Sequence, residues 1–256
     1  MSAGRSGPER RALPCGPGRD GWDDDVPAHS EGHPHPAGDR LARSGGPAPS
    51  GTLLVIAKAP VPGRVKTRLT PAYSPAEAAC LAEAALLDTL DVVLATPVRR
   101  RVLVLDGRPG DWLPSGIEVV PQCAGGLDAR LAHAFGLCDG PTLLIGMDTP
   151  QVTAELLTSG LELGPTDASF GPADDGGFWA LGLAEPDPAL LRGVPMSVPR
   201  TGAVQRRRLT GAGLTVRDMP LLRDVDTADD ARLVAAEAPH TRFAATFAAL
   251  AGTGAR

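Results

Sequence analysis

The sequence predicts an α/β protein in which helices cover both faces of a mainly parallel sheet, giving three layers (α/β/α). Two observations support this fold class: short apolar runs alternate with longer helical segments, and Gly or Pro bounds most of the runs. The alternation lies within residues 51–252, which we expect to form one domain. Residues 1–50 contain 17 Gly and Pro and no periodic apolar segment, so we expect them to form a disordered tail.

The first element is a strand at 53–57, whose five apolar residues are too few for a helix and include β-branched side chains. It runs into a Pro-x-Pro-Gly turn at 60–63, which continues neither a strand nor a helix. Four cations lie in this loop: Lys58, Arg64, Lys66 and Arg68. Because open α/β sheets bind ligands at the carboxyl ends of their strands, the loop is a candidate anion site.

Residue usage supports this interpretation of the loop. Among the 25 basic residues only two are lysines, and both of them, Lys58 and Lys66, lie in the loop. A compact ammonium differs from a guanidinium in geometry and hydration, so lysine here suits contacts with phosphate oxygens. The alternative is a solvated basic loop without a ligand.

The remaining elements follow in order. Ser74-Pro75-Ala76-Glu77 has the pattern of a capping box with proline at the first helical position, and it begins a helix that reaches about residue 95. Further strands are expected at 102–105, 117–120, 142–145, 168–170, 178–183 and 214–216. Further helices are expected at 127–137, 153–163 and 227–237, with a last helix closing the domain near residue 250.

Composition excludes several classes of protein. The net charge is −5, the wrong sign for a nucleic-acid binder. No run of 18 apolar residues is present, and the first residues lack the apolar core of a secretory signal. We therefore expect a cytoplasmic protein with no membrane span that does not bind nucleic acid.

Two acidic residues lie at the ends of expected elements, Asp148 after a strand and Asp226 before a helix. Asp148 comes directly after the strand 142–145, so its carboxylate should emerge at the same edge of the sheet as Lys58. Mg²⁺ or Mn²⁺ takes one or two such carboxylates together with substrate phosphates, although Asp148 can equally be a helix N-cap. Asp226 precedes a helix that Thr227 can cap, which leaves the Asp226 carboxylate available.

A second acidic segment, Asp174, Asp175, Gly176 and Gly177, lies between two expected strands. Its glycines would let a substrate approach the backbone closely. A plain hairpin turn explains the same pattern.

Four ordered motifs between about Thr52 and Val234 resemble those of a known family. They are AKAPVPGRVKTRL at 57–69, IGMDTP at 145–150, FGPADDGGFWALGL at 170–183 and LRDVDTADD at 222–230. The family they resemble is the bacterial GT-A-type glycosyltransferases of the nucleotide-diphospho-sugar transferase superfamily, some members of which are linked to arsenosugar biosynthesis. The resemblance implies a Rossmann-like GT-A fold that binds a nucleotide sugar within residues 51–252.

The resemblance also implies roles for individual residues. The cations Lys58, Arg64, Lys66 and Arg68 would lie near the phosphates, and Asp148 and Asp226 would bind Mg²⁺ or Mn²⁺. Gln122 occupies a position where relatives contact the base. Asp175 matches the acid of the family's Asp-Gly-Gly turn, with sugar binding or base catalysis as its role, and Asp174, Gly176 and Gly177 would contact the substrate beside it.

The leading hypothesis is metal-dependent transfer of a sugar from a nucleoside-diphosphate sugar to a small-molecule acceptor that the sequence does not identify. The chain departs from the family pattern at Gly126-Leu127-Asp128-Ala129-Arg130, which affects the details of that loop. It also departs at Met196-Ser197-Val198, which would alter the acceptor if that segment contacts it. One alternative is nucleotidyl transfer from a nucleoside triphosphate to a sugar phosphate or phospho-acid, since Lys-Thr-Arg-Leu at 66–69 also resembles guanylyltransferases that activate phospholactate. Another is a nucleotide-binding protein without catalysis.

Overall fold

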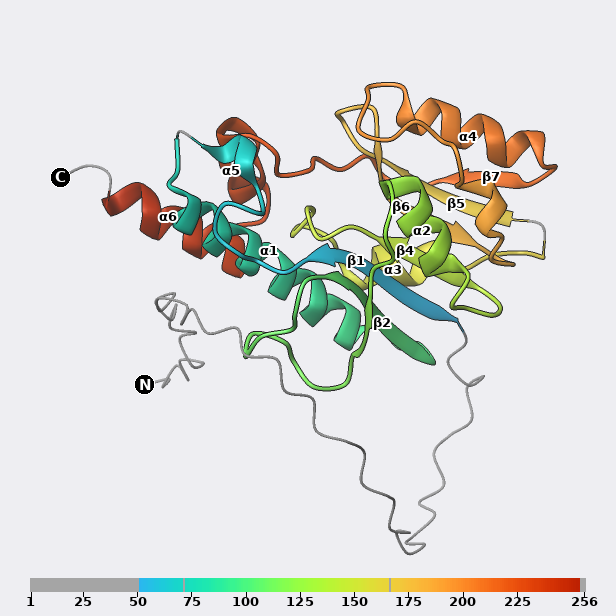
Figure 1. Ribbon diagram of the computed structural model, residues 1–256, viewed down its shortest axis with the longest axis horizontal. Helices are drawn as coiled ribbons and strands as arrows, with labels where there is room; N and C mark the ends of the chain where they lie inside the picture. Colours follow the sequence, from blue (N-terminus) through green and yellow to red (C-terminus); the bar gives the residue numbers. More distant parts are fainter. Residues whose placement is uncertain (1–50, 71, 166, 254–256) are drawn as a thin grey trace, which may run out of the picture. The chain divides into compact units, whose positions relative to one another are not determined.

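Seven strands form one sheet, in a computed structural model that describes residues 51–70, 72–165 and 167–253. The strands are β1 Thr52–Lys58, β2 Arg100–Asp106, β3 Glu118–Pro121, β4 Thr142–Ile145, β5 Asp167–Pro172, β6 Phe178–Leu183 and β7 Thr215–Asp218. Their order in the sheet is β3-β2-β1-β4-β6-β5-β7. Figure 1 shows the sheet with every strand except β3 labelled. The predicted disordered tail, residues 1–50, lies outside the described residues.

The sheet is mixed, with four of its six neighbouring strand pairs parallel. β6 is antiparallel to both β4 and β5 because the turn at 173–177 returns the chain directly beside β5. The predicted α/β class and mainly parallel sheet are therefore confirmed. In the parallel half, the carboxyl ends of β1 to β4 meet at one edge.

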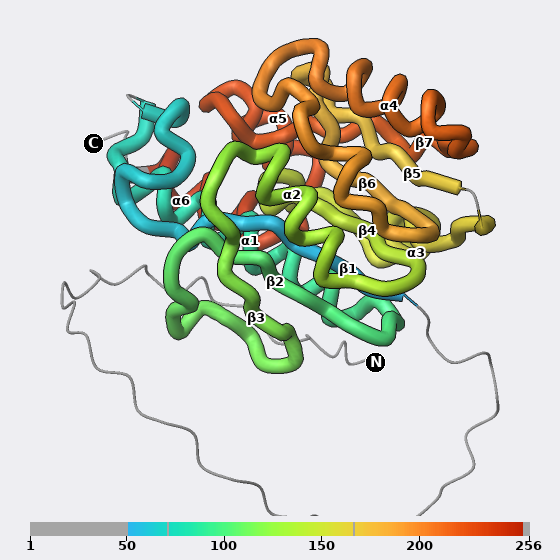
Figure 2. The backbone as a smooth tube through the Cα atoms, turned by 45° about the vertical axis from the view of Figure 1, so that its right-hand side comes forward, coloured from blue at the N-terminus to red at the C-terminus, as the bar shows by residue number. Residues whose placement is uncertain are grey.

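Within the described residues, six α-helices and two short 3-10 helices accompany the sheet. The helices are α1 Pro75–Ala95, α2 Leu127–Phe135, α3 Ala154–Leu161, α4 Thr201–Gly211, α5 Ala228–Glu237 and α6 Arg242–Thr253, with 3-10 turns at Thr67–Leu69 and Pro188–Leu190. Side chains alternate between the two faces along a strand. Leu53 and Val55 of β1 accordingly pack with α1 and α3, whereas Leu54 packs with α2 and α4 on the other face. The tube in Figure 2 shows these layers from a second direction.

A third apolar cluster joins α1 to α5 and α6. It includes Leu69, at the end of the basic loop, and Val225, just before α5, both of which are buried. The carboxylate of Asp88 on α1 accepts hydrogen bonds from the backbone amides of Arg242 (2.9 Å) and Phe243 (2.8 Å) at the start of α6. This cluster fixes both the basic loop and the segment before α5 against α1 and α6.

The expected helix starts are confirmed where side-chain caps define them. Ser74 and Glu77 form the capping box of α1, with Pro75 in its first turn. Thr227 caps α5 together with Asp230, so Asp226 is free of that role, as expected. Within the described residues, no helix combines the length and the apolar character that a membrane crossing requires.

One helix, α4, was not predicted. It contains Arg206-Arg207-Arg208, and it buries only Thr201, Gly202, Gln205 and Leu209. With a single large apolar residue on its buried face, α4 lacks the periodic pattern from which helices are recognised in a sequence.

Candidate functional site

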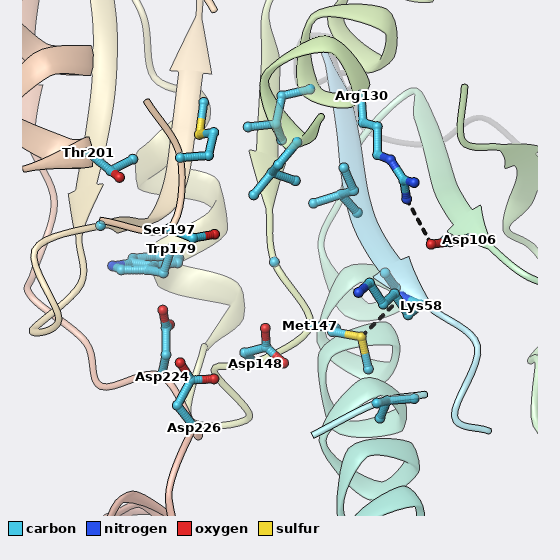
Figure 3. A pocket seen from close by; sticks show the side chains of 18 of the residues that line it. Lys58, Asp106, Arg130, Met147, Asp148, Trp179, Ser197, Thr201, Asp224 and Asp226 are labelled. Carbon is cyan, nitrogen blue, oxygen red and sulfur yellow. Dashed lines mark hydrogen bonds and ion pairs between the residues drawn. The ribbon is translucent and has the colours of Figure 1, made fainter. Parts of the chain in front are cut away.

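A cavity of about 620 Å³ opens where the carboxyl ends of β1, β2 and β4 meet (Figure 3). Five segments supply most of its walls: the loop after β1, the start of α2, the loop after β4, the segment 196–201 and the segment before α5. All four cations of the basic loop line it, namely Lys58, Arg64, Lys66 and Arg68, as do the acids Asp148, Asp175, Asp224 and Asp226. The predicted meeting of cations and carboxylates at one edge of the sheet is therefore present.

Lys66 lies between the two predicted metal-binding acids. Its backbone is in the left-handed region (φ 49°) and its side chain is only 7% exposed. The ammonium Nζ lies 2.6 Å from Asp148 Oδ1 and 3.6 Å from Asp226 Oδ1, and it also donates to the carbonyl oxygen of Val225. Burial by itself lowers the pKa of Lys66, but attraction by Asp148, and then by Asp226 and Asp224, outweighs burial, so the net pKa is raised. Lys66 is therefore a fixed positive charge that holds both carboxylates.

Two further groups complete the charged side of the cavity. Arg68 Nη1 donates to Asp226 Oδ2 at 2.9 Å from an exposed position. Burial, followed by repulsion from Asp148, raises the pKa of Asp224 to about 7 against its ordinary value of 3.8, with Lys66 partly offsetting the rise. Asp224 is thus the acid in this group for which ionisation is most costly.

The opposite wall carries a hydrogen-bonded network at the ends of β2 and β3. Arg130 of α2 donates through Nη1 to Asp106 Oδ2 (2.7 Å) and to Gln122 Oε1 (2.9 Å). The Gln122 amide nitrogen donates to the backbone carbonyls of Ala57 (2.8 Å) and Val104 (3.1 Å). Both amide hydrogens of Gln122 are therefore engaged, and the predicted contact with a base is not available to this amide as a donor.

The turn between β5 and β6 does not present all of its predicted residues to the cavity. Asp175 and Gly177 line it, but Asp174 does not, because its carboxylate forms an ion pair with Arg223 at 2.6 Å. Gly176 also lies outside the lining. At its φ of +85°, an added Cβ would lie 2.1 Å from the carbonyl oxygen of Pro199, so this glycine allows the turn to pack on segment 196–201.

Asp175 itself is engaged in the turn. Its Oδ1 accepts a hydrogen bond from the backbone amide of Gly177 at 2.7 Å. Such a bond is typical of a side chain that stabilises a turn. The arrangement accounts for the acid of this motif without a catalytic role.

The donor groups around Lys66 fit a divalent cation. Asp148 and Asp226 converge on one positive charge, and Mg²⁺ commonly uses only one or two carboxylates when phosphates and water supply its other ligands. Among the described residues, no group of three or more His, Cys, Asp and Glu side chains is arranged to hold a metal ion without such additional ligands. A metal here would therefore depend on the substrate.

Three cavity residues were given no role in the sequence analysis: Asp106, Arg130 and Asp224, although Asp224 lies in the acidic motif at 222–230. Asp106 follows the buried run 102–105 just as Asp148 follows 142–145, so the same reasoning would have identified it. Arg130 and Asp224 come near their partners only through the tertiary fold. No spacing in the sequence indicates those contacts.

Comparison with known proteins places the chain among bacterial relatives. Residues 80–198 match the family model "Uncharacterized protein conserved in bacteria (DUF2064)". A phosphoenolpyruvate guanylyltransferase from Salinispora arenicola is 33% identical over 205 residues, which span 75% of this chain and 90% of that protein. This chain belongs to the same family as that enzyme, and part of it matches the DUF2064 model.

A solved structure shows the same fold. The crystal structure of a protein from Desulfovibrio desulfuricans, described as a nucleotide-diphospho-sugar transferase, aligns with a TM-score of 0.70 and 25% identity, covering 80% of this chain and 95% of that one. The chain therefore has the Rossmann-like fold of nucleotide-diphospho-sugar transferases. Together the two comparisons support a transferase-type enzyme.

Proposed function

We propose that this protein is a nucleotidyltransferase, which transfers the nucleoside monophosphate part of a nucleoside triphosphate to a small phosphorylated acid or sugar phosphate. The observation that carries the proposal is the buried Lys66 ammonium between Asp148 and Asp226, beside a loop that adds Lys58 and Arg64. Phosphoryl-type transfer is catalysed mainly by positioning and by neutralisation of charge, which this arrangement supplies. The likeness to a guanylyltransferase over most of the domain gives independent support.

In the proposed reaction, an oxygen of the acceptor's phosphate or carboxylate attacks the α-phosphorus. The bond between that phosphorus and the oxygen leading to the β-phosphate breaks, and pyrophosphate leaves. The acceptor oxygen is already ionised at neutral pH, so no general base is needed. Lys58 and Arg64, which line the cavity, would neutralise charge on the triphosphate and the leaving group.

Asp148 and Asp226 are the residues that would hold Mg²⁺ or Mn²⁺. The metal, when bound, would act as a Lewis acid on the phosphate oxygens. This chain would then contribute the two carboxylates, with Arg68 orienting Asp226 through its 2.9 Å hydrogen bond.

Glycosyl transfer is the second candidate, because the Desulfovibrio relative is described as a nucleotide-diphospho-sugar transferase. Transfer of a sugar to a hydroxyl group with inversion requires a general base. Asp175 is the residue predicted for that role, and its carboxylate is hydrogen-bonded within its own turn. Nucleotidyl transfer to an ionised acceptor needs no such base, and the likeness to the guanylyltransferase favours it.

The experiment is a pyrophosphate-release assay on the full chain with Mg²⁺, each common nucleoside triphosphate, and a panel of acceptors that includes phosphoenolpyruvate, phospholactate and sugar phosphates. We expect pyrophosphate and a nucleotidylated acceptor in equal amounts, with at least a 100-fold loss of rate in Asp148→Asn. Asp139→Asn, at an exposed site away from the cavity, is the matched control and should leave the rate unchanged. Release of a nucleoside diphosphate from a nucleotide sugar, with no pyrophosphate from any triphosphate, would overturn the proposal.

A further inference from the structure

The wall formed by Asp106 and Arg130 has hydrogen-bonding groups that the protein does not use. Arg130 commits Nε to the carbonyl oxygen of Gly125 (3.1 Å) and Nη1 to Asp106 and Gln122. Its Nη2 and the Oδ1 of Asp106 have no hydrogen-bond partner among the residues that the structure describes. Both side chains are partly exposed and line the cavity. The wall therefore presents acceptor, acceptor and donor groups in a row: Asp106 Oδ1, Asp106 Oδ2 with its remaining lone pair, and the free N–H groups of Arg130.

This row is held rigidly. Gln122 ties Arg130 to the backbones of β1 and β2 through its two carbonyl contacts. Asp106 is the last residue of β2 and pairs in the sheet with Lys58 of β1. Groups fixed in this way lose little conformational entropy when a ligand binds. Gln122 is thus a positioning residue, and Arg130 and Asp106 are the groups that face the ligand.

The wall lies at a suitable separation from the phosphate-binding side. Asp106 ends β2, and Asp148 follows β4, which is two positions away in the sheet. Neighbouring strands are about 4.8 Å apart, so the two acids lie on the order of 10 Å apart across the edge. An extended nucleotide separates its base from its distal phosphates by a distance of this order. Leu127, which is 41% exposed and lines the same cavity, offers apolar surface to the face of a ring.

We infer that Asp106 and Arg130 recognise the base of the nucleotide and select guanine. Along its Watson–Crick edge guanine presents the N2 amino donor, the N1–H donor and the O6 acceptor. This order is the complement of the row on the protein: the Asp106 carboxylate accepts from N2 and N1, and Arg130 donates to O6. The inference rests on the proposed function, because it assumes that a nucleotide occupies the cavity.

The other bases fit the row less well. Adenine presents a lone pair at N1 and cytosine one at N3, each next to an amino group. When that amino group donates to one oxygen of the carboxylate, the ring lone pair either faces the other carboxylate oxygen, so that two acceptors oppose each other, or leaves that oxygen unpaired. Uracil has a single N–H between two carbonyl oxygens, one of which would face the carboxylate. An acceptor that the bound ligand leaves unpaired or opposed costs affinity, and a site built to hydrogen-bond a group rejects ligands that lack it.

The experiment measures dissociation constants of the full chain for GTP, ITP, XTP, ATP and CTP by calorimetry with Mg²⁺, for the natural protein and for Asp106→Asn. ITP lacks only the N2 amino group, and we expect it to bind about 10-fold more weakly than GTP. XTP replaces that amino group by a carbonyl. The amide of the variant would keep an oxygen that accepts from N1–H and Arg130, and it would add an N–H donor for the new carbonyl of XTP. The affinity of Asp106→Asn should therefore fall at least 10-fold for GTP and rise for XTP. Asp111→Asn, at an exposed position in the loop after β2, is the control and should bind the five triphosphates in the same order of affinity as the natural protein.

The outcomes separate this inference from the proposed function. Equal affinity for all five triphosphates, or an unchanged preference for GTP over XTP in a folded Asp106→Asn, would overturn guanine recognition by this wall and leave nucleotidyl transfer standing. Binding of no triphosphate would overturn the proposed function instead. Because ITP and XTP change the ligand and not the protein, the result with the natural chain holds even if the variant folds poorly.

Discussion

Replacing Asp224 by asparagine should make the protein more stable, and the gain should depend on pH. Burial and the nearby Asp148 raise the pKa of Asp224 from 3.8 to about 7. The native state thus binds this proton more tightly than the unfolded chain does, so stability falls as pH rises from about 4 to about 7. At about 1.36 kcal/mol per pH unit, the loss is complete above pH 7 and amounts to about 4 kcal/mol.

The amide of Asp224→Asn cannot ionise, so the variant should escape this loss. Its advantage over the natural protein should grow by about 2–3 kcal/mol between pH 5 and pH 8. For a domain of this size that corresponds to a melting-temperature difference that widens by roughly 5–10 °C. The assay is thermal unfolding followed by circular dichroism at pH 5, 6, 7 and 8, with EDTA present to remove metal.

Asp229→Asn is the control, since this acid lies five residues further on, in the first turn of α5, with its side chain 89% exposed. The control should track the natural protein at every pH. Parallel pH profiles for Asp224→Asn and the natural protein would refute the reasoning, because they would show that ionisation of Asp224 carries no cost in the folded state.

Three further substitutions test the supports of the site. Lys66→Met removes the cation between two carboxylates, which are themselves partly exposed, so the free energy of unfolding in urea should fall by about 1–3 kcal/mol. Mn²⁺ should restore more stability to the variant than it adds to the natural protein. An equal gain from Mn²⁺ in both proteins would contradict this expectation. Asp88→Ala leaves two backbone amides at the start of α6 without their acceptor, so chemical unfolding should show a loss of about 1–2 kcal/mol; no change would mean that α6 does not depend on this cap. Gly176→Ala places a Cβ against the carbonyl of Pro199 at a positive φ, so we expect lower thermal stability and altered proteolysis of segment 196–201. Unchanged stability and unchanged proteolysis would show that the turn has room for a side chain.

Strands β1, β2 and β4 could be predicted because they are largely buried on both faces and read as continuous apolar runs. The same feature located Asp148, since a polar residue directly after such a run must emerge at the carboxyl edge. Asp106 satisfies the same condition. The basic loop was found from its charge and its proline-glycine turn, both of which are local properties.

Other parts of the site depend on contacts that have no local signal. Gln122 was predicted to contact a base, but its amide binds carbonyls of β1 and β2, which are 65 and 18 residues away in the chain. Asp174 and Asp175 are adjacent in sequence, yet the ion pair of Asp174 with Arg223 directs it away from the cavity. Helix α4 escaped prediction because its buried face is mostly small or polar. In each case the decisive partner belongs to a distant segment.

The most direct test of the account is a binding panel of nucleoside triphosphates, nucleoside diphosphates and nucleotide sugars, each measured by thermal shift with and without Mn²⁺. We predict that a triphosphate gives the largest stabilisation, that the effect requires Mn²⁺, and that Asp148→Asn abolishes the metal-dependent part. Larger stabilisation by a nucleotide sugar than by any triphosphate would contradict nucleotidyl transfer as the function of this site.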